Sequence, residues 1–174
     1  MKHYDWQDLL DIAAAKNQKP FLLILDGLED PRNFGAILRT AEASGVDGVI
    51  IPKRRSVQVN DTVMRTSTGA ADLVPVAQVA NINEVIKRLK KEGIWVAGLE
   101  ANGDKDYREG DYTDGLALVI GGEGNGLSRL TRELCDYIVS IPMKGQITSL
   151  NASVAAALLL YEVVRQRDKI NREF

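Results

Sequence analysis

Apolar residues along the chain occur in short continuous runs, which alternate with segments where apolar positions recur every three or four residues. The continuous runs have the length of strands, and strands buried on both faces of a sheet carry such runs in place of an alternating pattern. They predict strands over 21–25, 46–51, 73–76, 94–99, 116–120 and 137–141.

The segments between these runs predict helices. Asp30 followed by Pro31 is a helix start, because aspartate caps free backbone N–H groups and proline fits the first helical position. Gly45 then ends that helix, and Gly93 ends a later one. The predicted helices cover 5–16, 31–44, 60–67, 82–92, 127–135 and 150–167.

The regular alternation of strand and helix predicts an α/β fold, with a parallel sheet and helices on both faces. A chain of 174 residues has the length of one ordinary domain, and it shows no internal repeat or long linker. We divide it at Lys19-Pro20, into an N-terminal helix and tail (residues 1–20) and a main domain (residues 21–174).

Composition is that of a globular protein, with 45% hydrophobic and 26% charged residues. The single cysteine, Cys135, excludes an internal disulfide and fits a reducing compartment, so we expect a cytoplasmic protein. We find no signal peptide, and the longest mostly apolar run, 152–161, is too short to cross a bilayer. We therefore expect no membrane association.

The net charge of −2 argues against strong nucleic-acid binding without excluding it, because local basic patches matter more than the sum. Four clusters either form a basic face or are solvated surface charges: Lys53-Arg54-Arg55, Arg65, Arg129 with Arg132, and Arg165 with Arg167.

Several kinds of chemistry are excluded by what the sequence lacks. The glycines of 121–126 fit a dinucleotide-binding fingerprint in no register, and there is no phosphate-binding loop motif. His3 is the only histidine and Cys135 the only cysteine, so we expect neither a metal site nor a histidine-activated nucleophile. Catalysis would then rely on Arg, Glu, Ser and Asn acting on a reagent that carries its own reactive group, such as S-adenosylmethionine (AdoMet).

Three segments carry polar residues or glycines where a buried element is expected. The first is 33–41, where Gly35 inside a helix costs about 1 kcal/mol and indicates close approach of another backbone or a ligand. The second is 120–127, a glycine-rich turn after a buried strand, which is where open α/β sheets bind ligands. The third is 141–155, where Ser149, Asn151 and Ser153 crowd the start of an apolar helix.

Each segment also has a simple structural explanation. Arg39 can be a solvated helix residue, and Glu123 can point into solvent from an ordinary turn. Ser149 is expected to cap the final helix, which is compatible with a functional role.

Taken together and in this order, the three segments resemble the signature motifs of the SpoU/TrmH family of RNA ribose 2′-O-methyltransferases, over about residues 21–167. The resemblance implies an enzyme that transfers a methyl group from AdoMet to the 2′-hydroxyl of a ribose in RNA. It also implies a C-terminal trefoil knot in the parallel α/β fold, although knots are very rare and the sequence pattern alone argues against one.

The resemblance also implies roles for individual residues. Those matching the catalytic positions are Asn33, Arg39, Glu123, Ser149 and Asn151, and those matching the cofactor site are Leu99, Gly121, Gly122, Ile141, Met143 and Leu150. Glu123 is expected to fix Arg39 or Asn33, or to orient its loop. Because an arginine is almost always charged at pH 7, we expect Arg39 to clamp an RNA phosphate and polarise the nucleophile instead of acting as a base.

Within the family, residues 23–33 and 49–55 are most similar to the branch that methylates a guanosine ribose in bacterial 23S rRNA. That branch usually carries an additional N-terminal RNA-binding domain, whereas some twenty residues precede the first strand here; we expect an isolated catalytic domain or a minimal form. The alternatives are a tRNA ribose 2′-O-methyltransferase and a non-catalytic RNA-binding protein on the same fold. A nucleotide-binding oxidoreductase is disfavoured by the failed fingerprint.

The final helix is apolar nearly all round, and such a helix must be buried on all sides. A partner subunit would cover it, and the alternative is a central position in the core. Since family members are homodimers with the site near the interface, we expect a homodimer that binds RNA and AdoMet.

Overall fold

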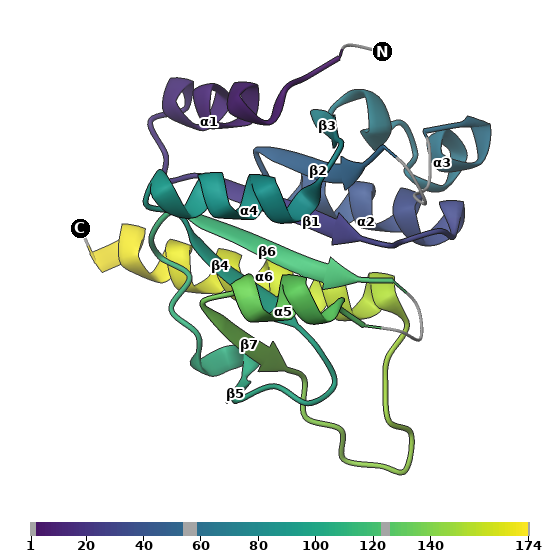
Figure 1. Ribbon diagram of the computed structural model, residues 1–174, viewed down its shortest axis with the longest axis vertical. Helices are drawn as coiled ribbons and strands as arrows, with labels where there is room; N and C mark the ends of the chain where they lie inside the picture. Colours follow the sequence, from purple (N-terminus) through teal and green to yellow (C-terminus); the bar gives the residue numbers. More distant parts are fainter. Residues whose placement is uncertain (1–2, 54–58, 123–125, 174) are drawn as a thin grey trace.

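Seven parallel strands form one sheet in the computed structural model, which describes residues 3–53, 59–122 and 126–173 (Figure 1). The strand order is β3-β2-β1-β6-β4-β7-β5, and every neighbouring pair is parallel. The strands are β1 (Phe21–Asp26), β2 (Gly48–Pro52), β3 (Val76–Val79), β4 (Trp95–Leu99), β5 (Lys105–Asp106), β6 (Leu116–Gly121) and β7 (Tyr137–Ser140).

The continuous apolar runs of the sequence correspond to buried strands, most clearly in the central strands β1 and β6. All six residues of β6 are buried, as are the first five of β1, because helices cover both faces of the sheet. The chain adds β2 and β3 on one side of β1, crosses to β4, and then returns to insert β6 between β1 and β4. The predicted parallel α/β fold is confirmed.

Helices α2 (Pro31–Ser44), α3 (Asp61–Thr66) and α6 (Ala152–Glu173) pack on one face, and α1 (Trp6–Ala15), α4 (Ile82–Lys91) and α5 (Arg129–Leu134) on the other (Figure 1). Two short 3₁₀ helices, η1 (Ala70–Asp72) and η2 (Tyr107–Glu109), complete the described elements. The ends of α2 follow the predicted signals: the Asp30 side chain accepts a hydrogen bond from the Arg32 N–H, and Gly45 ends the helix with a left-handed φ of 81°.

Two local predictions are wrong, and one short strand was not predicted. The third strand begins at Val76 and not at 73, because the chain first forms η1 and Pro75 has no N–H to donate to a ladder. The final helix begins at Ala152 and extends to Glu173, instead of covering 150–167. The two-residue edge strand β5 was not predicted, because Lys105 and Asp106 give no apolar run.

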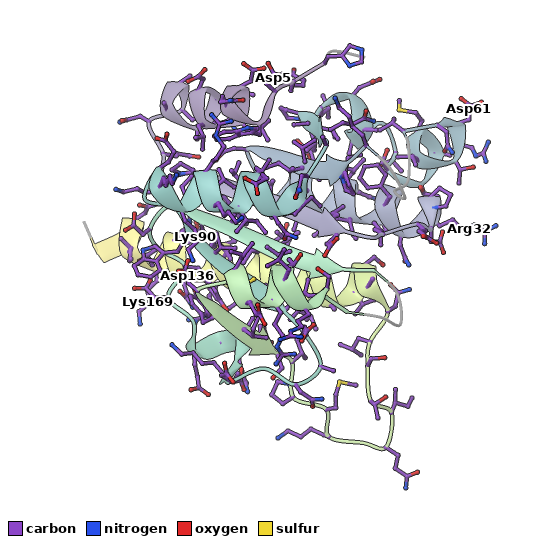
Figure 2. All side chains as sticks on the ribbon, viewed as in Figure 1. Asp5, Arg32, Asp61, Lys90, Asp136 and Lys169 are labelled. Carbon is purple, nitrogen blue, oxygen red and sulfur yellow. The ribbon has the colours of Figure 1, made fainter. Side chains whose placement is uncertain are left out.

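Side chains join the layers at the amino ends of the strands. Lys90 of α4 and Asp136, just before β7, form an ion pair of 3.4 Å (labelled in Figure 2). Arg167 of α6 donates hydrogen bonds to the backbone carbonyls of Lys19, Pro20, Tyr112 and Asp114. These contacts fix the last helix across one end of the sheet and leave the opposite, carboxyl end for a site. Within the described part of the chain, no helix has the length and apolar content needed to span a membrane.

Candidate active site

A cavity of about 710 Å³ lies at the carboxyl ends of β4 and β6, next to the segments that follow β7 and lead into α6. The carboxyl ends of parallel strands are the usual place for ligands in open α/β sheets. All six residues that the sequence assigns to the cofactor line this cavity: Leu99, Gly121, Gly122, Ile141, Met143 and Leu150. The structure thus brings together residues that lie up to 51 positions apart in the chain; their contact with a cofactor stays a prediction.

Glycines form the cavity wall at the end of β6 because two backbone segments press against them. A Cβ added to Gly121 would lie 2.3 Å from the carbonyl carbon and oxygen of Gly126, and one added to Gly122 would lie 2.2 Å from the carbonyl oxygen of Gly27. The Gly122 N–H also donates to the Asp26 carbonyl, at 2.8 Å. Any side chain at Gly121 or Gly122 would push the end of β1 or the exit of the turn away from the wall.

Glu100 also lines the cavity, directly after β4, and the sequence analysis missed it. Its Oε1 accepts a hydrogen bond from the Leu127 N–H at 2.9 Å, and its Oε2 forms an ion pair with Arg132 of α5. Arg132 in turn donates to the Asn102 carbonyl at 3.1 Å. The sequence signal that could have indicated Glu100 is an acidic residue immediately after a buried strand. Its partners lie 27 and 32 positions away, so a local sequence pattern does not reveal them.

Asn33 and Asn151 meet at the start of α6. The Asn151 Nδ2 donates to the Asn33 Oδ1 at 3.2 Å, and Asn33 is buried in the first turn of α2. The Asn151 Oδ1 accepts from the N–H groups of Ser153 and Val154. Asn151 therefore caps α6, and the predicted capping role of Ser149 is wrong, because the helix begins two residues later than expected. Ser149 lines the cavity instead, with no hydrogen-bond partner for its hydroxyl among the described residues.

Arg39 is exposed and is not among the described residues that line the cavity. It lies six residues after Asn33, which in an α-helix is about 9 Å along the axis and about 120° around it. Gly35, on the same face as Arg39, approaches α3: a Cβ there would lie 1.7 Å from the Thr66 Oγ1. The close approach predicted at Gly35 is therefore made by α3. Glu123, the remaining predicted catalytic residue, lies outside the described residues.

Most of the candidate basic clusters are engaged in contacts within the chain. Arg129 pairs with Glu133 at 3.1 Å and Arg165 with Glu162 at 2.8 Å, while Arg132 and Arg167 have the contacts given above. Lys53 and Arg65 are exposed, and Arg54 and Arg55 lie outside the described residues. The structure thus supports the surface-charge alternative for α5 and α6. Among the described members of these clusters, Lys53 and Arg65 stay exposed without an ion pair.

Cys135 is half-buried, and its Sγ donates to the Thr131 carbonyl. Burial raises the pKa of this thiol to about 12, so it is not a nucleophile at neutral pH. No group of three or more potential ligands that could hold a metal occurs among residues 3–53, 59–122 and 126–173.

Comparison with known proteins agrees with this geometry. The sequence profile of the SpoU rRNA Methylase family matches residues 20–161. The Bacillus subtilis protein described as "Putative TrmH family tRNA/rRNA methyltransferase YacO" is 50% identical over 169 residues, which are 97% of this chain and 68% of that protein. A Staphylococcus saprophyticus protein with the description "Putative TrmH family tRNA/rRNA methyltransferase" is 56% identical over 170 residues, with 96% and 68% covered.

Solved structures also match this chain. The SpoU methyltransferase AviRb from Streptomyces viridochromogenes, in complex with the cofactor AdoMet, has a TM-score of 0.81 at 37% identity over 87% of this chain and 62% of that chain. The AdoMet-bound rRNA methyltransferase from Sinorhizobium meliloti has a TM-score of 0.82 at 28% identity, with 95% and 61% covered. This chain belongs to the SpoU rRNA Methylase family, and spans about two thirds of the length of these relatives.

Proposed function

We propose that this chain transfers a methyl group from AdoMet to the 2′-hydroxyl of a ribose in RNA. Its family is one of RNA methyltransferases, and AdoMet is the cofactor bound in solved members. The observation that carries the proposal is the single cavity shared by the glycine-rich turn after β6, the segment after β7 and the start of α6.

The cavity suits AdoMet in size and in chemistry. Its volume of about 710 Å³ lies in the range of small-molecule pockets. Leu99, Ile120, Ile141 and Leu150 supply apolar walls, and Gly121 lets the backbone itself face a ligand. When bound, AdoMet supplies an electrophilic methyl group. The residues of the chain need only hold the two reactants in line and exclude water.

We place the target ribose beside Asn151 and Ser149. Both ends of the Asn151 amide are engaged, one by Asn33 and the other by the first turn of α6, so its orientation is fixed. The Ser149 hydroxyl is available to hydrogen-bond a ribose hydroxyl. These groups can orient the nucleophile without a histidine, and Asn151→Ala should lower turnover far more than cofactor affinity.

We propose Arg39 as the anchor for an RNA phosphate. Its exposed guanidinium has no ion pair among the described residues, and a planar fork of donors suits a phosphate. Arg39→Lys keeps the charge but loses the bidentate geometry, so turnover should fall; full turnover in this variant would contradict the assignment. Since Arg39 does not line the cavity of its own chain, it would act there through RNA that extends over α2 or from a second copy.

A homodimer is proposed from the exposed face of α6. In a row at spacings of four and three residues, Val154, Leu158 and Tyr161 are 48%, 39% and 46% exposed, and Leu150, in the segment that leads into α6, is 39% exposed. The buried apolar residues in the described part of α6 lie on the opposite side of the helix, among them Ala156, Leu160 and Val163. A second copy related by a twofold axis would cover the row and, through Leu150, adjoin the cavity. Light scattering at micromolar concentration tests this, and a monomer would contradict it.

For the fold of this enzyme, we propose that the C-terminal segments form a trefoil knot.

For the substrate, we propose a guanosine of 23S rRNA. The test of this substrate is transfer of labelled methyl from AdoMet to purified 23S rRNA, 16S rRNA and bulk tRNA, each in unmodified form. Label on 23S rRNA alone supports the proposed target, and label on tRNA alone supports the alternative branch. AdoMet binding without transfer to any RNA would indicate that an RNA-targeting domain or partner is needed, and absence of both transfer and AdoMet binding would favour a non-catalytic RNA-binding protein.

A further inference from the structure

One partner of an ion pair lies in the wall of the proposed cofactor cavity. Glu100 is the only charged side chain among the described residues that line the cavity. Its side chain is 11% exposed and is paired with Arg132, whose side chain is 44% exposed. The Arg132 guanidinium does not line the cavity, so a ligand in the cavity would lie closer to the Glu100 carboxylate than to the guanidinium.

The cofactor and its product differ by one charge. The sulfonium gives AdoMet a net charge of +1, because the ammonium and carboxylate of its methionine part offset each other. After methyl transfer, the sulfur of S-adenosylhomocysteine is a neutral thioether and the net charge is zero. Shape and hydrogen-bonding groups are otherwise almost the same, so charge is the main property by which a cavity can distinguish the two.

We infer that the pairing of Glu100 with Arg132 keeps the cavity wall nearly neutral, so that loss of either charge alone shifts the preference of the cavity between the cationic cofactor and the neutral product. This inference rests on the proposed use of AdoMet. The intact pair presents little net charge; an unpaired Arg132 would repel the sulfonium, and an unpaired Glu100 would attract it. Such effects are stronger at a partly buried pair than in bulk water, because the effective dielectric constant is lower.

The same pair also has a mechanical role, which the test must separate from the electrostatic one. Glu100 holds the Leu127 N–H at the exit of the glycine-rich turn, and Arg132 holds the Asn102 carbonyl after β4. Loss of these bonds would loosen the wall for both ligands alike. Such loosening would leave the ratio of the AdoMet and S-adenosylhomocysteine dissociation constants unchanged, whereas the electrostatic effect would change that ratio.

The experiment measures the Kd of AdoMet and of S-adenosylhomocysteine by calorimetry for the wild-type chain, Glu100→Gln, Arg132→Gln and the double variant. Glutamine at position 100 keeps an acceptor for the Leu127 N–H. In Glu100→Gln we expect the ratio of the S-adenosylhomocysteine Kd to the AdoMet Kd to fall at least about threefold, and in Arg132→Gln to rise at least about threefold. The double variant removes both charges, so its ratio should return to within about twofold of wild type.

Glu162→Gln is the matched control, because it removes a carboxylate from a second arginine–glutamate pair whose residues do not line the cavity. It should leave the ratio unchanged. Equal weakening of both ligands in the two single variants would overturn the inference while leaving the proposed function intact. A wild-type chain that binds neither ligand would overturn both. Opposite shifts that shrink as salt is raised would establish their electrostatic origin.

Discussion

Gly121→Ala is the most direct test of the glycine-rich wall. The added Cβ would lie 2.3 Å from the carbonyl carbon and oxygen of Gly126 and 2.9 Å from the Leu127 nitrogen, against 3.4 Å or more for an ordinary contact. The turn must therefore withdraw by about 1 Å, and since every clashing atom belongs to the backbone, no side-chain rotation relieves it. Overpacking of this kind costs about 1–3 kcal/mol, which for a domain of this size lowers Tm by about 2–12 °C.

Cofactor binding should fall further than stability. A displacement of about 1 Å at a binding wall is enough to cost about a hundredfold in a finely positioned site, so we expect AdoMet affinity to fall at least about tenfold. Gly145→Ala is the control, because a Cβ there meets nothing within 4 Å and its φ lies outside the left-handed range. Calorimetry and thermal unfolding give the two quantities. A Gly121→Ala protein with wild-type Tm and AdoMet affinity within twofold of wild type would refute the packing argument.

Four further predictions follow from single contacts. Burial raises the pKa of the Cys135 thiol to about 12, so a thiol reagent at pH 8 should modify it only after unfolding; rapid reaction of the native protein would contradict this. Arg167→Ala removes the donor that four backbone carbonyls share. The free energy of unfolding, measured by urea titration, should fall by about 2–4 kcal/mol. A loss below about 0.5 kcal/mol would show that water replaces the donor. Leu158→Glu places a charge in the exposed row of α6 and should convert a dimer into a monomer in light scattering, without unfolding the chain. Hydrogen bonds from Arg165 lower the pKa of Glu162, so its carboxylate stabilises the fold above the unfolded-state pKa of about 4.3. This contribution is lost as pH falls through the lowered pKa of the folded state, so Glu162→Gln should lower Tm at pH 7 and have a progressively smaller effect as the solution is acidified.

The sequence predicted those features that depend on neighbouring residues. The start and end of α2 were predicted correctly because Asp30, Pro31 and Gly45 act on the backbone within a few positions. The central strands were predicted because burial on both faces demands continuous apolar residues. The third strand was misplaced because Leu73 and Val74 are apolar but lie outside the sheet. The chain first forms η1, and hydrogen bonding to β2 as a strand begins only at Val76.

The site was predictable where the motifs are contiguous, and not where it depends on contacts between distant residues. Glu100 was missed because its importance comes from Leu127 and Arg132, which the fold brings to it. The cap of α6 was assigned to Ser149 and belongs to Asn151, since both are good caps and the choice depends on where the chain turns. Arg39 and Asn33 were assigned to one site by the family resemblance; α2 places Asn33 in a buried position and Arg39 in an exposed one, about 120° apart around the helix, and their shared role stays a prediction.

The central claim is that the methyl group reaches a ribose 2′-hydroxyl. The direct measurement is mass spectrometry of nucleosides from RNA that the chain has methylated with isotopically labelled AdoMet, with Asn151→Ala in parallel. We predict a single labelled nucleoside whose methyl stays with the ribose on glycosidic cleavage, and its near-complete loss in the variant. Label that stays with the base would contradict the claim.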